Sequence, residues 1–203
     1  MKKSAILFGI NDYHGSPLKN AANDAEALSK KLAELGFETK CFFDVDSETM
    51  NRELVAFKSD LAQSSVGLFF FAGHGIQCKG ENYLATKSTS FFDESSCKYT
   101  AIALNMVIDI FEESKVNTKI IILDACRDNP FVTWRSAAND GLAPVYAPKG
   151  TIIAFSTKTE QKASDGLNDH GVYTNALLTH IATKNLSIED MFKRVRNTVS
   201  SHT

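Results

Sequence analysis

The feature that most constrains this chain is a series of short, continuous apolar runs, each bounded by polar or glycine-containing sequence. A run of this kind is typical of a strand that is buried on both faces, as in a parallel sheet with helices on either side. Five such strands are predicted, at residues 4–10, 37–45, 66–72, 119–124 and 151–155.

Between and after these runs, apolar residues recur at the spacing of one helix face. Five helices are therefore predicted, at residues 23–36, 50–61, 104–111, 173–183 and 188–200. Strands that alternate with amphipathic helices indicate the α/β class. We expect a single domain over residues 1–203, a three-layer α/β/α sandwich with a mostly parallel sheet of five to six strands flanked by helices.

Charge and hydropathy exclude several classes of function. The chain has 22 basic and 24 acidic residues, a formal net charge of -2, which argues against a general nucleic-acid binder. No apolar run approaches the ~18 residues that span a bilayer, so no membrane partner is expected. The apolar stretch after Lys3 is too short for a secretory signal, and we therefore expect a cytoplasmic protein with reduced cysteines.

Two chemically active side chains follow two of the predicted strands. The strand at 66–72 is followed closely by His74, and the strand at 119–124 is followed closely by Cys126. Because ligands of open α/β sheets bind at the carboxyl ends of strands, these residues meet if the two strands are neighbours. An imidazole beside a thiol makes a strong nucleophile. The backbone amides of Gly75 and Cys126 would then form an oxyanion hole.

Less specific interpretations of these residues remain open. A single cysteine after an apolar strand is more often a small core residue than a nucleophile. Cys78 lies four residues after His74, but a zinc site needs about four ligands and the other cysteines lie in unrelated segments, so no metal is predicted. We expect His170 and His180 on the surface.

A set of short motifs in a fixed order extends across nearly the whole chain. Its members are Ile10-Asn11, Asn20, Asn23-Asp24-Ala25, Phe71-Ala72-Gly73-His74-Gly75, Asn82-Tyr83-Leu84, Asp124-Ala125-Cys126-Arg127-Asp128-Asn129-Pro130-Phe131, Gly141-Leu142-Ala143, Phe155-Ser156-Thr157, Ala163-Ser164-Asp165-Gly166 and Tyr173-Thr174. With these motifs the chain resembles a prokaryotic caspase-like domain, from the clan of metacaspases, paracaspases and caspases. The resemblance implies a cysteine endopeptidase with a Cys–His dyad. Cys126 would be its nucleophile and His74 its general acid and base.

The resemblance also divides the chain. Residues 1–127 would match the large subunit of a caspase, residues 128–149 the linker, and residues 150–203 the small subunit. It implies a peptide or protein substrate, and a sensor module or partner protein that activates the enzyme. No cofactor is expected, because the acidic cluster with which many metacaspases bind calcium is not evident.

Specificity is expected to differ from that of caspases, which cut after Asp and carry Gln two residues before the nucleophile. Here that residue is Asp124, as in metacaspase-like proteases that cut after Arg or Lys. By the same resemblance, Asp24 and Asp165 join it in a pocket for a basic side chain. A cut at Arg135 in the linker would then be an autocleavage. Alternatively, Asp24 caps the first helix, Asp165 is a turn residue, or Asp124 holds a neighbouring loop.

Two other classes of function compete with the protease. One is a caspase-fold adaptor with a silenced site, although His74 and Cys126 are both intact. The other is a flavodoxin-like binding domain, which would need a glycine loop for phosphate after the first strand. The residues there, Gly9-Ile10-Asn11-Asp12, do not form one.

Overall fold

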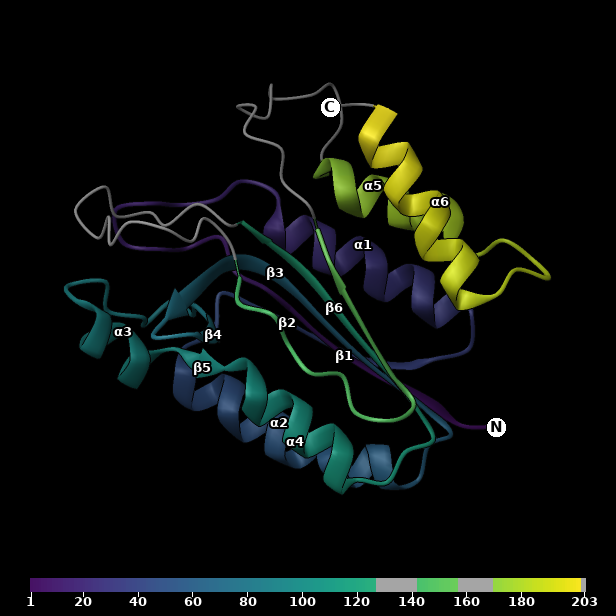
Figure 1. Ribbon diagram of the computed structural model, residues 1–203, viewed down its shortest axis with the longest axis horizontal. Helices are drawn as coiled ribbons and strands as arrows, with labels where there is room; N and C mark the ends of the chain where they lie inside the picture. Colours follow the sequence, from purple (N-terminus) through teal and green to yellow (C-terminus); the bar gives the residue numbers. More distant parts are fainter. Residues whose placement is uncertain (127–141, 157–169, 202–203) are drawn as a thin grey trace.

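The computed structural model describes residues 1–126, 142–156 and 170–201, with the backbone alone at Glu94 and Cys126. Five strands pair in parallel in the order β2-β1-β3-β6-β7, so each predicted strand is present (Figure 1). The fold class is confirmed. The strands are β1 (Lys3–Gly9), β2 (Glu38–Phe43), β3 (Val66–Cys78), β6 (Thr118–Cys126) and β7 (Thr151–Phe155).

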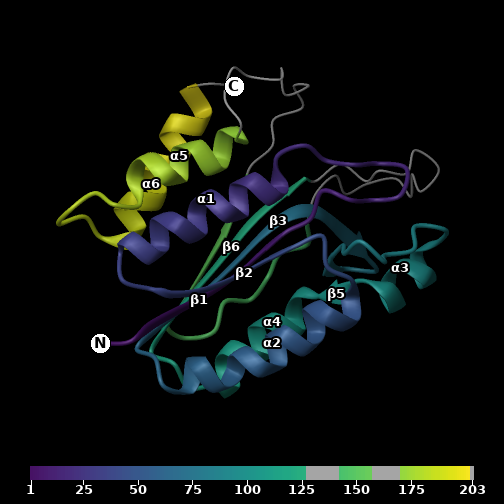
Figure 2. The same cartoon turned by 180° about the vertical axis from the view of Figure 1, so that it is seen from behind.

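Helices cover both faces of this sheet. The views of Figures 1 and 2 place three helices on one face, α1 (Ala21–Glu34), α5 (Val172–His180) and α6 (Ile188–Ser201). The opposite face is covered by α2 (Ser47–Ala62) and α4 (Leu104–Glu113). None of the helices in the described ranges is long and apolar enough to cross a membrane.

The position of the central strand β3 between two layers of helices explains why its apolar run is continuous. Phe69 and Phe71 pack into the core on the side of α2 and α4. Leu68 and Phe70 pack into the core on the side of α1, α5 and α6. Because successive side chains of a strand point to opposite faces, a strand between two helical layers needs apolar residues at every position. Each of these large side chains contributes about 1.5–3 kcal/mol by its burial.

The predicted end of the third strand is wrong. β3 does not stop at Gly73 but continues through His74 to Cys78, and it turns back at Lys79 and Gly80 into β4 (Glu81–Leu84). Both turn residues have positive φ, as a two-residue hairpin turn of type I′ requires. The parallel pairing with β6 ends at His74, and the antiparallel pairing with β4 begins at Gly75.

The hairpin belongs to a small extension that the helical and strand periodicities did not predict. It includes α3 (Glu94–Thr100) and β5 (Ile102–Ala103), whose two residues pair with β4. All three elements are too short to show a clear hydrophobic period. The extension begins directly after the pair His74 and Cys126, at which we expect the chemistry.

Candidate active site

His74 and Cys126 occupy directly paired positions of neighbouring strands. The parallel register of β3 and β6 joins Gly73 to Ala125 and His74 to Cys126. Adjacent strands lie about 4.8 Å apart in the direction of their hydrogen bonds, so the two backbones meet at this point. The structure therefore brings together the two residues that the sequence analysis selected, which lie 52 positions apart in the chain.

The imidazole of His74 has one defined tautomer when it is neutral. Its Nε2 lies 2.9 Å from the backbone carbonyl oxygen of Ser16, and a carbonyl oxygen can only accept a hydrogen bond. Nε2 therefore carries the proton, and Nδ1 is the basic atom of the ring. His74 is 4% exposed. Protonation of Nδ1 leaves the Nε2 bond in place, so the Ser16 carbonyl also stabilises the imidazolium.

Tyr13 holds both the ring and the backbone of His74. The two rings have centroids 4.5 Å apart and planes inclined by 53°. The Tyr13 hydroxyl accepts a bond from the backbone N–H of His74 at 3.0 Å and donates one to the carbonyl of Ala85 at 3.2 Å. Tyr13 is buried. The Tyr13 hydroxyl therefore links His74 of β3 to the segment that follows β4.

The close approach of Tyr13 requires glycine at position 73. A Cβ atom on Gly73 would lie 2.3 Å from the Tyr13 hydroxyl oxygen and 2.7 Å from the ring of Phe71. Neither distance is possible for real atoms, so any larger residue would displace the tyrosine that supports His74. Tyr13 and Ser16 were not among the functional residues predicted from the sequence. Their only signal was their place in the polar loop after the first strand, at the edge of the sheet where ligands bind.

Gly75 follows the His74–Cys126 pair directly. It is buried, and it is the first residue of β3 that pairs with β4, opposite Leu84. The predicted oxyanion hole, formed by the amides of Gly75 and Cys126, stays a prediction.

Asp24 and Asp124, from distant segments, meet at the start of α5. The Oδ1 atom of Asp24 accepts hydrogen bonds from His170 Nδ1 at 3.1 Å and from the Gly171 N–H at 3.2 Å. An Oδ2 atom of Asp124 accepts a bond from the Thr174 hydroxyl at 2.8 Å. A Cβ atom on Gly171 would lie 3.2 Å from Asp24 Oδ2 and 3.7 Å from Asp124 Oδ2. Both carboxyl groups therefore border the same small volume.

The position of Asp24 contradicts its interpretation as a helix cap. The N-cap of α1 is Asn20, and Asp24 lies within the first turn with its carboxyl group bonded to residues before α5. His170 is not a surface residue either, since only 27% of its side chain is exposed. Asp165 and Arg135 lie outside the described residues.

The surroundings of Asp24 make its charge costly. The pKa of Asp24 is raised to about 7, first by burial and second by the nearby charge of Asp124, although the bond from the Gly171 N–H lowers it. Tyr173 is also affected, because burial and the charge of Asp124 raise the pKa of its phenol. This corner therefore holds one buried and one partly buried carboxyl group close together, where a cation would be strongly favoured.

The remaining cysteines lie elsewhere. Cys78 and Cys97 are buried, and Cys41 is half-buried. Burial raises the pKa of the Cys41 thiol to about 11, which leaves it inert at neutral pH. Within residues 1–126, 142–156 and 170–201, no group of three or more His, Cys, Asp or Glu side chains has an arrangement that could hold a metal ion.

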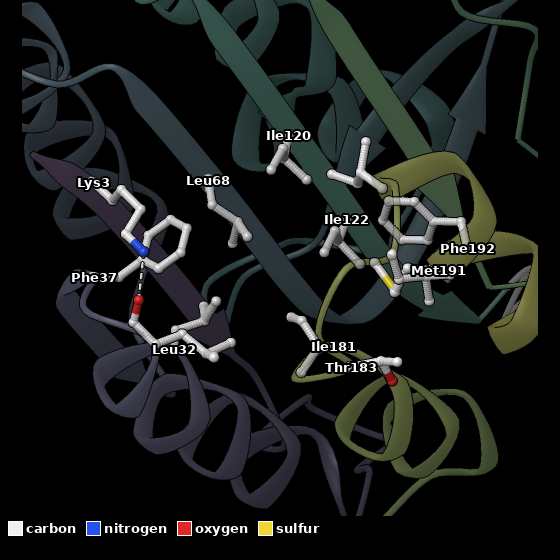
Figure 3. Close-up of a pocket in the computed structure, with 13 residues that line it drawn as sticks. Lys3, Leu32, Phe37, Leu68, Ile120, Ile122, Ile181, Thr183, Met191 and Phe192 are labelled. Atoms are coloured by element: carbon white, nitrogen blue, oxygen red, sulfur yellow. Dashed lines mark hydrogen bonds between the residues drawn. The ribbon is translucent and has the colours of Figure 1, made fainter. Parts of the chain in front are cut away.

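A separate apolar cavity of about 270 Å³ lies between α1, α6 and the sheet (Figure 3). Leu68, Ile120, Ile122, Met191 and Phe192 contribute to its wall. Lys3 is the charged residue among the described residues of its lining, and its ammonium group bonds the Leu35 carbonyl and lies 5.0 Å from the centroid of the Phe37 ring. The described part of the lining has no carboxylate or imidazole, the groups that a catalytic centre of this kind needs.

Comparisons with known proteins agree with this fold. A family model described as the caspase domain matches residues 2–203. Human mucosa-associated lymphoid tissue lymphoma translocation protein 1 is 24% identical over 127 residues, which cover 62% of this chain and 15% of that protein. Its mouse homologue matches over the same shares with the same identity. The chain thus matches about a seventh of the length of these relatives.

A solved structure supports the fold independently. The crystal structure of the Drosophila initiator caspase Dronc superimposes with a TM-score of 0.72 at 15% sequence identity. The match covers 97% of this chain and 72% of that one. At this identity the likeness supports the arrangement of helices and strands.

Proposed function

This chain belongs to the caspase-domain family, and from that premise we propose that it is a cysteine endopeptidase that cleaves peptide bonds after Arg or Lys. One observation carries the proposal. His74, with its Nε2 held by the Ser16 carbonyl, is paired through the backbone with Cys126 where the parallel pairing of β3 and β6 ends. This is the place and the pair of residues that nucleophilic catalysis by a thiol needs.

In the proposed reaction, Nδ1 of His74 takes the proton of the Cys126 thiol, and the thiolate attacks the peptide carbonyl. The amides of Gly75 and Cys126 would bind the oxyanion. The imidazolium then gives its proton to the leaving amine, and a thioester remains. Water, deprotonated by Nδ1, hydrolyses that thioester and restores the thiol. A general base of this kind contributes about 100- to 10,000-fold to the rate.

The acidic corner supports the choice of a basic side chain. Asp24 and Asp124 border one volume beside Gly171, and Asp124 lies two residues before Cys126. A guanidinium or ammonium group placed there would be attracted by both carboxyl groups, whereas an acidic side chain would be repelled. We propose that Asp165 contributes to the same pocket, as the family resemblance implies.

Processing in the linker would leave the protein assembled. We propose a cut at Arg135, by the enzyme itself. The side chain of Asn82 bonds the backbone of Ala143 twice, at 2.8 and 2.7 Å, and β7 pairs along β6. A chain cut before residue 142 would therefore keep its second part attached. Incubation of the wild type beside Cys126→Ala, followed by mass spectrometry, tests this, and the absence of cleavage fragments from the wild-type sample contradicts it.

The main experiment is a comparison of fluorogenic peptides that end in Arg, Lys or Asp. We expect turnover after Arg and Lys in the wild type and none in Cys126→Ala or His74→Ala. Turnover after Asp alone would refute the basic pocket. The same turnover is measured in parallel samples that contain calcium, or a cognate sensor or partner protein. These samples test whether the protein is an effector that needs an activator. A complete lack of turnover in every sample would favour a catalytically silent adaptor.

A further inference from the structure

The pocket proposed for a basic side chain already holds an internal partner. Of the two oxygens of Asp24, Oδ1 receives the His170 ring nitrogen and the Gly171 N–H at short distance, and Oδ2 lies 3.4 Å from the same N–H. Only 5% of the Asp24 side chain is exposed. His170 thus covers the carboxyl group that would meet the substrate.

The two partners of Asp24 differ in their freedom to move. Gly171 donates from the backbone at the start of α5, where its own carbonyl accepts the first bond of that helix from Asn175 at 2.9 Å. This contact is fixed as long as the helix is formed. His170 donates from a side chain that precedes the helix and is 27% exposed. Its ring can rotate towards solvent about two side-chain bonds, without any change in α5.

A substrate guanidinium would need the position that His170 now fills. Arg binds a carboxylate best through two parallel N–H···O bonds, which require both oxygens of the acceptor. With His170 on Oδ1, Asp24 offers no such pair. Among the described residues, the other polar groups near this corner include the Asp124 carboxyl group, the Thr174 hydroxyl and the Gly171 N–H, and none of these three is an imidazole.

We propose that His170 is an internal ligand of the specificity pocket, which closes Asp24 in the free protein and swings aside when a basic side chain binds. This inference rests on the proposed function of the site. It makes His170 a competitor of the substrate, so its removal should strengthen the binding of a basic side chain. If His170 instead only positioned Asp24 for the substrate, its removal would weaken that binding.

The experiment uses acetyl-arginine amide as the probe and Cys126→Ala protein, which cannot turn over. We expect the probe to shift the NMR signals of the His170 ring and to leave those of His180 unchanged. His180 is the matched control, because it ends the same helix and bonds Thr198 at 2.8 Å, away from the acidic corner. The citrulline analogue has nearly the same shape without the charge, and it should shift neither ring.

Affinity provides the second measurement. In the same background, His170→Ala should bind the probe about 3- to 30-fold more tightly, and His180→Ala should bind it as the parent does. His170→Gln keeps an N–H donor without an imidazole and should fall between them, and it replaces the alanine variant if that one does not fold. The inference would be overturned if the His170 variants bound the probe equally or more weakly. It would also be overturned if the NMR signals of the His170 ring did not shift, or if no variant bound the probe.

The outcome also separates this inference from the proposed function. If arginine peptides are never cleaved but the probe displaces His170, the pocket assignment holds and the endopeptidase does not. If arginine peptides are cleaved but His170→Ala binds the probe no better, the endopeptidase holds and the internal ligand does not.

Discussion

The hydroxyl of Tyr13 lies between two backbone groups of the active-site edge, since it accepts a bond from the N–H of His74 and donates one to the carbonyl of Ala85. A loop after β1 thereby sets the position of the proposed catalytic base on β3. The same loop supplies the Ser16 carbonyl that fixes the tautomer of that base. The geometry of His74 therefore depends on a segment with no regular secondary structure.

Tyr13→Phe tests this support. The change leaves the ring in place but removes the partner of two buried backbone groups, which costs about 1–3 kcal/mol. For a chain of this size, each lost kcal/mol corresponds to a melting temperature about 2–4 °C lower. Calorimetry should show this decrease. Tyr99→Phe is the control, because Tyr99 is 84% exposed, and an equal melting temperature for both variants would contradict the assigned role.

Gly73→Ala should damage the proposed active site more than the rest of the fold. The added methyl group must displace both the Tyr13 hydroxyl and the Phe71 ring. We expect a loss of peptide turnover of at least about tenfold, in line with the sensitivity of catalysis to small displacements. The comparison is Gly67→Ala on the same strand, where the nearest atom is a terminal methyl of Leu61. That variant should lose stability but keep its turnover per folded molecule, and similar losses in both would argue against the Tyr13 contact.

Asn82→Ala should loosen the chain after residue 141. The Asn82 side chain is buried and makes two short bonds to the backbone of Ala143, so its removal leaves an N–H and a carbonyl without partners. We expect a loss of about 2 kcal/mol or more in the free energy of unfolding by urea. Asn105→Ala on the exposed side of α4 is the matched control. Indistinguishable urea curves would show that the bonds to Ala143 contribute nothing.

Asp24→Asn should change the dependence of stability on pH. The pKa of Asp24 is raised in the folded protein to about 7, so between about pH 4 and pH 7 the unfolded chain releases a proton that the folded chain keeps. Folding stability due to this group therefore falls as pH rises through that window, by about 2–4 kcal/mol. Asparagine has no such proton. Relative to the wild type, Asp24→Asn should become more stable from pH 5 to pH 8 in urea titrations, and parallel profiles would rule this out.

The same carboxyl group predicts how substrate binding responds to pH. A cationic side chain binds the ionised form of Asp24, so KM for an arginine peptide should fall as pH rises through about 7. Asp24→Asn should raise KM and remove this part of the pH dependence. A citrulline peptide measured as an inhibitor provides the neutral reference, and a KM that does not respond to the substitution would place the basic side chain elsewhere.

The sequence by itself determined the sheet and the pair of residues at its edge. Continuous apolar runs predict strands buried on both faces, and the chemistry of such a sheet lies at their carboxyl ends, so His74 and Cys126 could be selected before their pairing was known. The same reasoning set the end of the third strand too early, because Gly73, His74 and Gly75 interrupt the apolar run although the strand stays buried through Ile76.

Tertiary structure alone decided what surrounds those residues. The contacts of Tyr13, Ser16 and His170 come from irregular segments, where no periodic pattern exists to indicate which side chain turns inward. Asp24 and Asp124 were expected together from the family resemblance, but their meeting at the start of α5 depends on how α1 and α5 pack over the same face of the sheet. Periodicity reports which face of an element is buried, whereas a specific contact between distant loops depends on distances that only the folded chain sets.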